Sequence, residues 1–414
     1  MRRLTLLLAA CALAGTSRAE TVEQAIAAAI GRDPDLAAAA AERDAAQARL
    51  DQARAEGGPT VSLSGSLGVG HLNPGGFFGI TAEGVAPRAA QITAEMPIFT
   101  GGRLSAGQAQ ASAGLAIGNA ALAARERQLE LDVASAYADV YAARTSRQAA
   151  SYGAAQLAET ERQAELLFRA GETARTEYLQ AQARRAEAQA AVARAEGELQ
   201  SAAARFMSLT GLAAASVDES PGLPAAPASR DEAVRAALAG NPAIVEADAA
   251  VAAAQAAVRG ASAERMPNVA AFAEGSSIRD QFFPDYKADA VTAGVRARWT
   301  IFDSGRTRSK VAEATAGLRS AEARSRSARR DVEVQTVVAW EALQAARSQR
   351  LAAEDQRNAA QAALRDARLE FQAGAKPLLV VMDAERDALA ADAAVARSDG
   401  EVARAAWRLH ILTR

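Results

Sequence analysis

The sequence has little cysteine, histidine and aromatic residue. Of its 414 residues, one is cysteine (Cys11), two are histidine and 4% are aromatic. A single cysteine excludes a disulfide within the chain and any cysteine-based metal site. The two histidines, His71 and His410, lie far apart in the sequence, in no spacing that suggests a zinc site or a catalytic triad. The sequence therefore predicts no cofactor, no metal and no enzymatic activity.

Long apolar runs are also missing. No segment approaches the roughly 18 consecutive apolar residues that indicate a transmembrane helix. The N-terminus has the shorter pattern of a secretory signal: Arg2 and Arg3, an apolar stretch from Leu4 to Ala14, and small residues at Ser17 and Ala19. We therefore expect residues 1–19 to be a signal peptide. An alternative is a lipoprotein cleavage site at Leu8 to Cys11, which would leave a very short apolar segment before the cysteine.

No excess of charge of either sign is present. The 47 basic residues nearly balance the 49 acidic ones, so nothing suggests a nucleic acid partner. Alanine is abundant, whereas the 29 glycines and 12 prolines are few and clustered. This composition favours long, closely packed helices over a thick globular core.

The sequence contains an internal duplication with an offset of about 200 residues, which is far longer than the period of a solenoid. We predict a first structural repeat at 20–210, a second at 230–414, and a proline-containing linker at 211–229. The matching segments are Asp33 to Leu36 with Asn241 to Ile244, Pro97 to Arg103 with Thr300 to Arg306, and Phe168 to Gly171 with Phe371 to Gly374.

Each repeat has the pattern of a helix, two strands, a long helix, a turn and a further helix. A loop rich in glycine and proline, His71 to Pro87, separates the strands of the first repeat. The predicted elements are a helix at 20–56, strands at 61–69 and 89–99, and helices at 101–168 and 177–210, followed in the second repeat by a helix at 230–265, strands at 268–278 and 290–302, and helices at 305–371 and 378–412.

The strands alternate strictly between apolar and polar residues. On the last strand, apolar residues such as Val291 and Val295 share one face, whereas Arg296 and Arg298 share the other. This pattern favours a transmembrane barrel strand with lipid outside and water inside, although a half-buried soluble strand has the same alternation. Four strands cannot close a barrel, so several chains must share one. Two chains would give eight strands around a filled interior, and three would give twelve around a lumen.

The chain resembles the TolC-type outer-membrane efflux proteins over its whole mature length. The resemblance rests on the order of short motifs, duplicated in both halves: Arg32 to Leu36, Ile98-Phe99 with Ile301-Phe302, and the Phe-x-x-Gly turns at 168–171 and 371–374. It implies a mainly α fold with a small membrane β part, in which a homotrimer forms a shared twelve-stranded barrel and a helical tunnel. It also implies the outer membrane of a Gram-negative bacterium, contact with its lipid, a periplasmic adaptor protein, and an inner-membrane pump or ABC exporter.

The resemblance also implies a gate at the periplasmic end. By position, Thr176 and Glu177 match a polar-acidic pair, Phe371 replaces a tyrosine, Lys376 replaces an arginine, and Asp383 matches one of two aspartates that ring the opening. The second aspartate position is occupied by Val380. Lysine lacks the planar fork of arginine, so a link from Lys376 to Glu177 would be a single flexible contact.

Each gate residue also has an ordinary structural interpretation. Thr176 and Glu177 could be a helix N-cap and its first-turn acid, Pro377 a first-turn proline, and Asp383 part of a solvated face. The turns Ala170-Gly171-Glu172 and Ala373-Gly374-Ala375 are the expected adaptor contacts. Their glycines could equally serve only the turn geometry.

The predicted function is an exit duct for small toxic compounds. The outer-membrane component of a type I protein secretion system would have the same architecture and is the alternative. A soluble periplasmic coiled-coil scaffold is the third possibility, against which the alternating strands argue.

Overall fold

The computed structural model describes residues 21–72, 83–217, 222–281 and 285–414. The predicted signal peptide, including Cys11, lies outside the described residues, as does part of the loop predicted at 71–87. Within the described ranges, each helix is either too short or too polar to cross a membrane.

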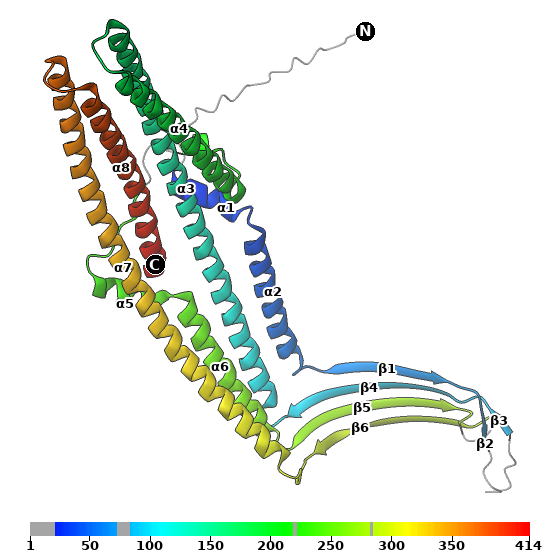
Figure 1. The fold of residues 1–414 in the computed structure, drawn as a ribbon. Helices are drawn as coiled ribbons and strands as arrows, with labels where there is room; N and C mark the ends of the chain where they lie inside the picture. The colour runs from blue at the N-terminus through cyan, green and yellow to red at the C-terminus, as the bar shows by residue number, and fades with distance from the viewer. Residues whose placement is uncertain (1–20, 73–82, 218–221, 282–284) are drawn as a thin grey trace, which may run out of the picture. The chain divides into compact units, whose positions relative to one another are not determined.

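The chain forms two compact units, and each contains parts of both sequence repeats. Figure 1 labels the helices and strands that make up these units. The first unit comprises Met1–Ala37 (described from residue 21), Ala124–Asn241 and Asp331–Arg414; the second comprises Ala38–Ala123 and Pro242–Arg330. Helices α3 (Arg103–Ala170) and α7 (Arg306–Gln372) each contribute residues to both units. The units therefore do not coincide with the predicted repeats. The units describe packing in space, whereas the repeats at 20–210 and 230–414 are a prediction from the similarity of the two halves of the sequence.

The two N-terminal helices predicted at 20–56 and 230–265 are each interrupted. The structure has α1 (Val22–Ile30) and α2 (Pro34–Ala55) in place of the first, and α5 (Arg230–Gly240) and α6 (Pro242–Ala263) in place of the second. The prediction of continuous helices was wrong because proline lacks a backbone N–H and disfavours helical geometry in the preceding residue. The Asp33 carboxylate then accepts a 2.6 Å hydrogen bond from the Leu36 amide at the start of α2.

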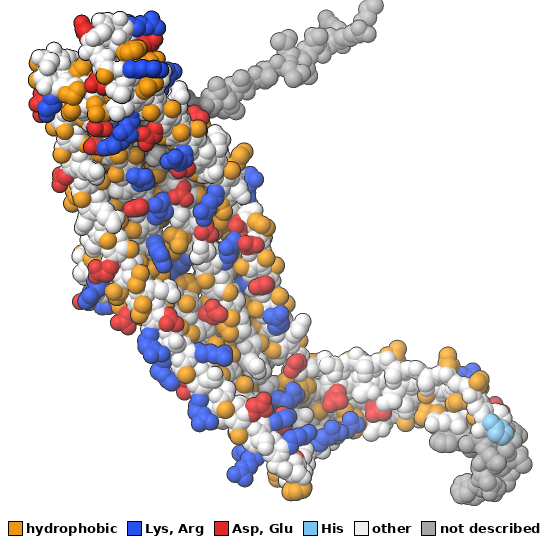
Figure 2. Space-filling view, viewed as in Figure 1, with side chains coloured by type: hydrophobic (Ala, Val, Ile, Leu, Met, Phe, Trp, Pro, Cys, Tyr) orange, Lys and Arg blue, Asp and Glu red, His pale blue; other side chains and the backbone are white. Residues whose placement is uncertain are grey.

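Corresponding helices of the two repeats have nearly equal lengths. Helices α3 and α7 contain 68 and 67 residues, and each is about 100 Å long at ~1.5 Å per residue. Helices α4 (Arg175–Thr210) and α8 (Leu378–Thr413) both contain 36 residues. The two long helices and the two C-terminal helices predicted from the sequence are thus confirmed to within two residues at each end. Basic and acidic side chains are interspersed along the helices (Figure 2).

Glycine reverses the chain after each long helix. Gly171 and Gly374 have φ angles of +78° and +71°, which a side-chain-bearing residue rarely adopts. The Glu172 amide donates a hydrogen bond to the Leu167 backbone carbonyl at 2.9 Å, and the Ala375 amide donates one to the Glu370 backbone carbonyl at 2.8 Å. These hydrogen bonds satisfy carbonyls at the ends of α3 and α7 in the manner of a Schellman motif.

The first unit has a core of small and medium apolar side chains. One cluster contains Leu343, Val402 and Leu409, and another contains Leu378, Met382 and several alanines. Glycine allows α3 and α8 to approach closely: a Cβ placed on Gly400 would lie 3.1 Å from the Ala142 side chain. The segment predicted as a linker also packs in this unit, through the short helix η2 (Ala214–Ser216). Arg144 donates hydrogen bonds to the carbonyls of Ala214 and Val217.

The second unit contains a four-stranded antiparallel sheet in the order β1-β4-β5-β6. Its strands are β1 (Thr60–Leu67), β4 (Arg88–Phe99), β5 (Asn268–Arg279) and β6 (Lys287–Arg298). A short pair, β2 (Gly70–Leu72) and β3 (Glu83–Val85), occupies the ends of the predicted loop. Strand β6 ends at Arg298 and not at Phe302 as predicted. Directly after the strand, the Trp299 indole N–H donates to the Arg265 carbonyl at 3.0 Å, a contact to the segment just after α6 that no local pattern indicates.

The register of the sheet separates its two faces. One row across the four strands is Leu63, Ile92, Gly275 and Val291, and the neighbouring row is Ser64, Gln91, Ser276 and Ala290. Side chains alternate between the faces along each strand, so one face is largely apolar and the other is polar. We call the first the apolar face. Its side chains are largely uncovered within the chain, with Leu63 80% exposed and Val291 90% exposed.

Candidate functional site

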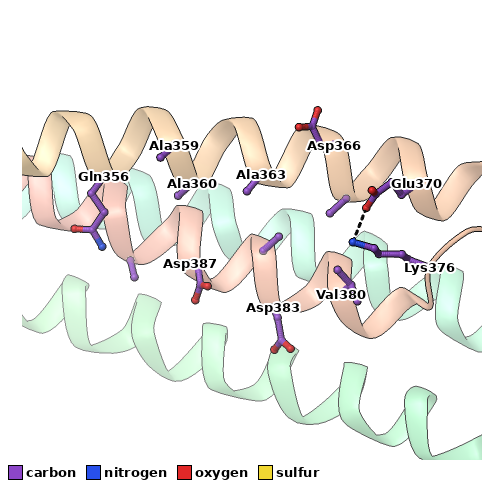
Figure 3. A pocket seen from close by; sticks show the side chains of 13 residues that line it. Gln356, Ala359, Ala360, Ala363, Asp366, Glu370, Lys376, Val380, Asp383 and Asp387 are labelled. Atoms are coloured by element: carbon purple, nitrogen blue, oxygen red, sulfur yellow. Dashed lines mark ion pairs between the residues drawn. The ribbon is translucent and has the colours of Figure 1, made fainter.

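The resemblance predicts functional residues around the turns after α3 and α7, and the structure has an acidic hollow there. The hollow lies between α7 and α8, has a volume of about 910 Å³, and is lined largely by alanine (Figure 3). One ammonium group, that of Lys376, lies among four carboxylates. These are Asp366, Glu370, Asp383 and Asp387.

Lys376 forms an ion pair with a residue that the sequence did not indicate. Its ammonium nitrogen lies 3.0 Å from the Glu370 carboxylate, across the turn that joins α7 to α8 (Figure 3). Glu177 instead accepts a hydrogen bond from the Thr173 hydroxyl. Within one chain, therefore, the expected link from Lys376 to Glu177 is replaced by two local contacts. Both the ammonium and the Glu370 carboxylate are nearly half exposed, so the pair contributes little stability.

Asp383 lies between two arginines. The Arg184 guanidinium of α4 is 3.4 Å from its carboxylate, and Arg386 of α8 is 3.9 Å away. A hydrogen bond with Asp387, followed by the attraction of that carboxylate, raises the pKa of Arg386. The Asp383 side chain remains 46% exposed. Its charge is therefore partly balanced by α4, and Asp383 also joins α4 to α8.

The structure corrects two predicted helix caps. Thr176 lies inside α4, whose N-cap is Ala174 without a side-chain hydrogen bond, so Thr176 is not the cap. The first-turn position of Glu177 is confirmed. Pro377 is the N-cap of α8 and not its first residue. The chain enters both helices from an extended residue: the cap of α4, Ala174, lies two residues before the predicted cap, and Pro377 lies one position before the first residue of α8.

Aromatic residues near both turns pack against neighbouring side chains. Phe371 packs against the apolar cluster that contains Leu378 and Met382. Phe168, at the matching place in the first repeat, stacks on Tyr178 with 5.8 Å between ring centroids. The six predicted adaptor-contact residues are all exposed, as a docking surface requires. They are Ala170, Gly171, Glu172, Ala373, Gly374 and Ala375.

A buried ionic network near these turns was not predicted from the sequence. The Glu385 carboxylate of α8 is 2.8 Å from the Arg368 guanidinium of α7 and accepts a 3.0 Å hydrogen bond from the Thr160 hydroxyl of α3. Glu385 is 3% exposed. A sequence signal exists, because Glu385 follows Leu378 and Met382 at the three-to-four-residue spacing of the apolar stripe on α8.

The two predicted lumen arginines lie on the polar face of the sheet. Arg296 is in register with Ala270, and Arg298 with Asn268. The guanidinium carbon of Arg296 lies 4.6 Å from the centre of the Phe272 ring. Among the described residues, no group of three histidine, cysteine or acidic side chains is placed to hold a metal ion.

Comparison with known proteins identifies the family. The profile of the outer membrane efflux protein family matches residues 25–212 and 233–413. The outer membrane efflux protein BepC of Brucella suis biovar 1 (strain 1330) is 28% identical over 277 residues, which cover 66% of this chain and 60% of BepC. The chain therefore matches less than two thirds of the length of this relative.

Solved structures show the same fold. The outer-membrane channel OprN superposes with a TM-score of 0.81 at 23% identity, over 95% of this chain and 89% of OprN. The outer membrane protein VceC of Vibrio cholerae gives a TM-score of 0.82 at 20% identity, over 95% of this chain and 96% of VceC. The duplicated helices, the sheet with its exposed apolar face and the family match agree: the chain belongs to the outer membrane efflux protein family.

Proposed function

We propose that this protein is the outer-membrane exit duct of a tripartite efflux system, and that it passes small toxic compounds from the periplasm to the exterior. The observation that carries the proposal is the four-stranded sheet, whose apolar side chains are exposed within the chain. Such a face is costly in water and favourable in lipid. The relative BepC is named an efflux protein, which favours efflux over protein secretion.

Closure of the barrel requires several chains. Strands β1 and β6 are the two edges of the sheet, and an unpaired edge in lipid costs several kcal/mol for each unsatisfied backbone group. Pairing of β6 of one chain with β1 of the next removes both edges. Three chains supply twelve strands, enough to enclose a lumen, and Arg296 and Arg298 would then face the water inside.

The gate would lie at the acidic hollow. Three copies of Asp383 and the neighbouring carboxylates would make a constriction that favours cations, since like charges around a narrow path attract counter-ions. The pair Lys376–Glu370 lies at the turn after α7, and the hydrogen bond between Thr173 and Glu177 lies at the turn after α3. The exposed turns at 170–172 and 373–375 would contact the periplasmic adaptor, which in turn engages an inner-membrane pump or ABC exporter.

Planar-bilayer conductance tests this function when the oligomeric mass is measured on the same detergent-extracted sample. Discrete channels from a species of three chains are expected. A monomer without channel activity, recovered in the soluble periplasm, would contradict the proposal and favour the scaffold. The alternative, type I secretion, would be favoured by a different result. Inactivation of the inner-membrane partner would then leave drug susceptibility unchanged and abolish the export of a secreted protein.

Single substitutions test the gate. Glu177→Ala and Lys376→Ala should raise the conductance of the closed channel and the entry of large antibiotics, because each removes a contact at one turn. Glu313→Ala is the matched control, since it removes an exposed carboxylate of α7 outside the hollow. Unchanged conductance in both gate variants would count against these residues as gate elements.

We also propose that residues 1–19 are removed on export, leaving repeats 20–210 and 230–414 joined by 211–229. The apolar stretch and small residues before Glu20 support this. N-terminal sequencing of the membrane-inserted protein should begin at Glu20. A blocked N-terminus whose mass indicates acylated Cys11 would instead support the lipoprotein alternative.

A further inference from the structure

Three basic residues lie side by side at one end of the apolar face. Arg88 of β4 is in register with Arg279 of β5, and Arg279 is in register with Lys287 of β6. All three belong to the same row as Leu67 of β1. Like charges directly opposite each other destabilise a sheet, so this row calls for an anionic partner.

Acidic residues of the chain balance this row incompletely. Asp280 lies 3.1 Å from the Arg88 guanidinium, and Asp289 lies 2.9 Å from Arg279. Within the described part of the chain, Lys287 has no ion-pair partner. The strand ends that carry the row thus retain one unbalanced ammonium group beside two partly exposed ion pairs.

A groove lies directly beside the row. Most of the groups that line it are apolar, and Ser277 and Asp289 line the end nearest the basic residues. The groove has a volume of about 390 Å³ and crosses all four strands. Its floor is at Gly275, which stands between Ile92 and Val291 in the register and has no side chain; a Cβ there would lie 3.3 Å from Ile92 Cγ2. Gly275 is two positions along the apolar face from Arg279, about 13 Å at ~3.3 Å per residue.

The position along the strand matches a lipid headgroup. From Arg279 to Val269, at the other end of β5, the apolar face extends over ten residues, or about 33 Å along the strand. A barrel strand tilted by about 40° spans a height of about 25 Å over that length, which is the height of the apolar band of outer-membrane barrels. The row stands at the strand ends that lead to hairpins and away from the helices.

We propose that this end of the apolar face binds a phosphate-bearing lipid. The phosphate would be held by Lys287 with Arg279 and Arg88, and an acyl chain would lie in the groove over Gly275. The inference rests on the proposed function, since it requires the sheet to lie in a membrane. A lipid fits better than a soluble anion, because the groove opens on the same face as the cations and becomes apolar over Gly275, between Ile92 and Val291.

Retention of lipid by the purified oligomer tests the inference. The protein and its variants are reconstituted in vesicles of zwitterionic phosphatidylcholine containing anionic phosphatidylglycerol, extracted in mild detergent, and analysed by native mass spectrometry. Lys287→Gln and Gly275→Val should each lower the retained phosphatidylglycerol about tenfold, through the headgroup and the acyl chain respectively. Arg296→Gln, on the opposite face of β6, is the control and should leave retention unchanged.

Bilayer conductance of the same samples separates this inference from the proposed function. Channels in every variant with equal lipid retention would overturn the lipid site and leave the duct intact. Displacement of the lipid by inorganic phosphate, with Gly275→Val unaffected, would also overturn it by showing an anion site alone. Loss of lipid in Lys287→Gln and Gly275→Val, with channels preserved, would support it.

Discussion

Replacement of Arg368 by alanine should destabilise the region around the buried Glu385 carboxylate more than replacement of Glu385 itself. The Glu385 side chain is 4% exposed, whereas the Arg368 side chain is 40% exposed. Without the guanidinium, the carboxylate keeps the Thr160 hydroxyl as its hydrogen-bond donor but loses the opposite charge. In Glu385→Gln no buried charge is left behind, and the freed arginine can turn to water.

The expected costs follow from this asymmetry. Removing one partner of a buried ion pair costs about 3–5 kcal/mol. Partial exposure of Arg368 means that solvent already screens the pair, so we expect about 2–3 kcal/mol for Arg368→Ala. Glu385→Gln exchanges a charged hydrogen bond for a neutral one and should cost about 1 kcal/mol.

Amide hydrogen exchange of the purified protein measures these costs locally. At about 1.4 kcal/mol for each factor of ten, protection of the α8 amides near Glu385 should fall roughly 30- to 140-fold in Arg368→Ala and about fivefold in Glu385→Gln. Arg386→Ala is the matched control. Arg386 is an exposed arginine of α8, the helix that carries Glu385, and it pairs with its neighbour Asp387. Its protection factors should stay close to the wild type.

Two outcomes would refute this reasoning. Equal loss of protection in Arg368→Ala and Glu385→Gln would show that an uncompensated buried charge is not the source of the cost. Unchanged protection in Arg368→Ala would show that the carboxylate is solvated in the purified protein and that the network contributes nothing.

Three further predictions concern the backbone, packing and pH. Gly374→Ala should lower the free energy of unfolding by about 1–2 kcal/mol, because alanine disfavours the φ of +71°. Gly317→Ala inside α7 should raise it by up to about 1 kcal/mol, because alanine favours the helix and no neighbouring atom is in the way. Thermal unfolding followed by circular dichroism compares the two variants. Gly153→Leu should raise the unfolding rate, since even a Cβ would overlap the Leu389 side chain and force it to move, and wild-type kinetics would contradict that packing. Hydrogen bonds from Thr307 lower the pKa of Asp303 below its ordinary value. The ionised Asp303 carboxylate therefore stabilises the fold fully above its ordinary pKa, and this contribution is lost as the pH falls through the lowered pKa. Amide hydrogen exchange at the start of α7 should therefore be faster in Asp303→Asn than in the wild type at neutral pH, and the two rates should converge in acid. A difference that does not depend on pH would contradict a stabilising role of the ionised Asp303.

Much of the fold could be predicted because it depends on neighbours in the chain. The alternation on the strands, the long alanine-rich helices and the glycine turns at 171 and 374 are local patterns, and the structure contains each of them. The breaks before Pro34 and Pro242 were missed although their cause is local, since the alanine-rich surroundings suggested continuous helices.

The candidate site was less predictable because its contacts cross between elements. Asp383 and Lys376 could be singled out by their positions near a turn. Their actual partners, Arg184 and Glu370, depend on how helices pack and on how a turn closes. A glutamate on a long polar helix usually faces water, so the burial of Glu385 could be seen only once α3 and α7 were placed against α8.

The sequence by itself determined the duplication, the element types and the two-faced strands, because these follow from backbone propensity and from periodicities of 2 and 3.6 residues. Tertiary structure alone decided the strand order and the register. The pairing of β4 with β5 joins the two repeats, and with it Arg88, Arg279 and Lys287 come side by side from three strands. No local pattern encodes that row, because residues about 190 positions apart become neighbours only when the backbone hydrogen bonds of the sheet form.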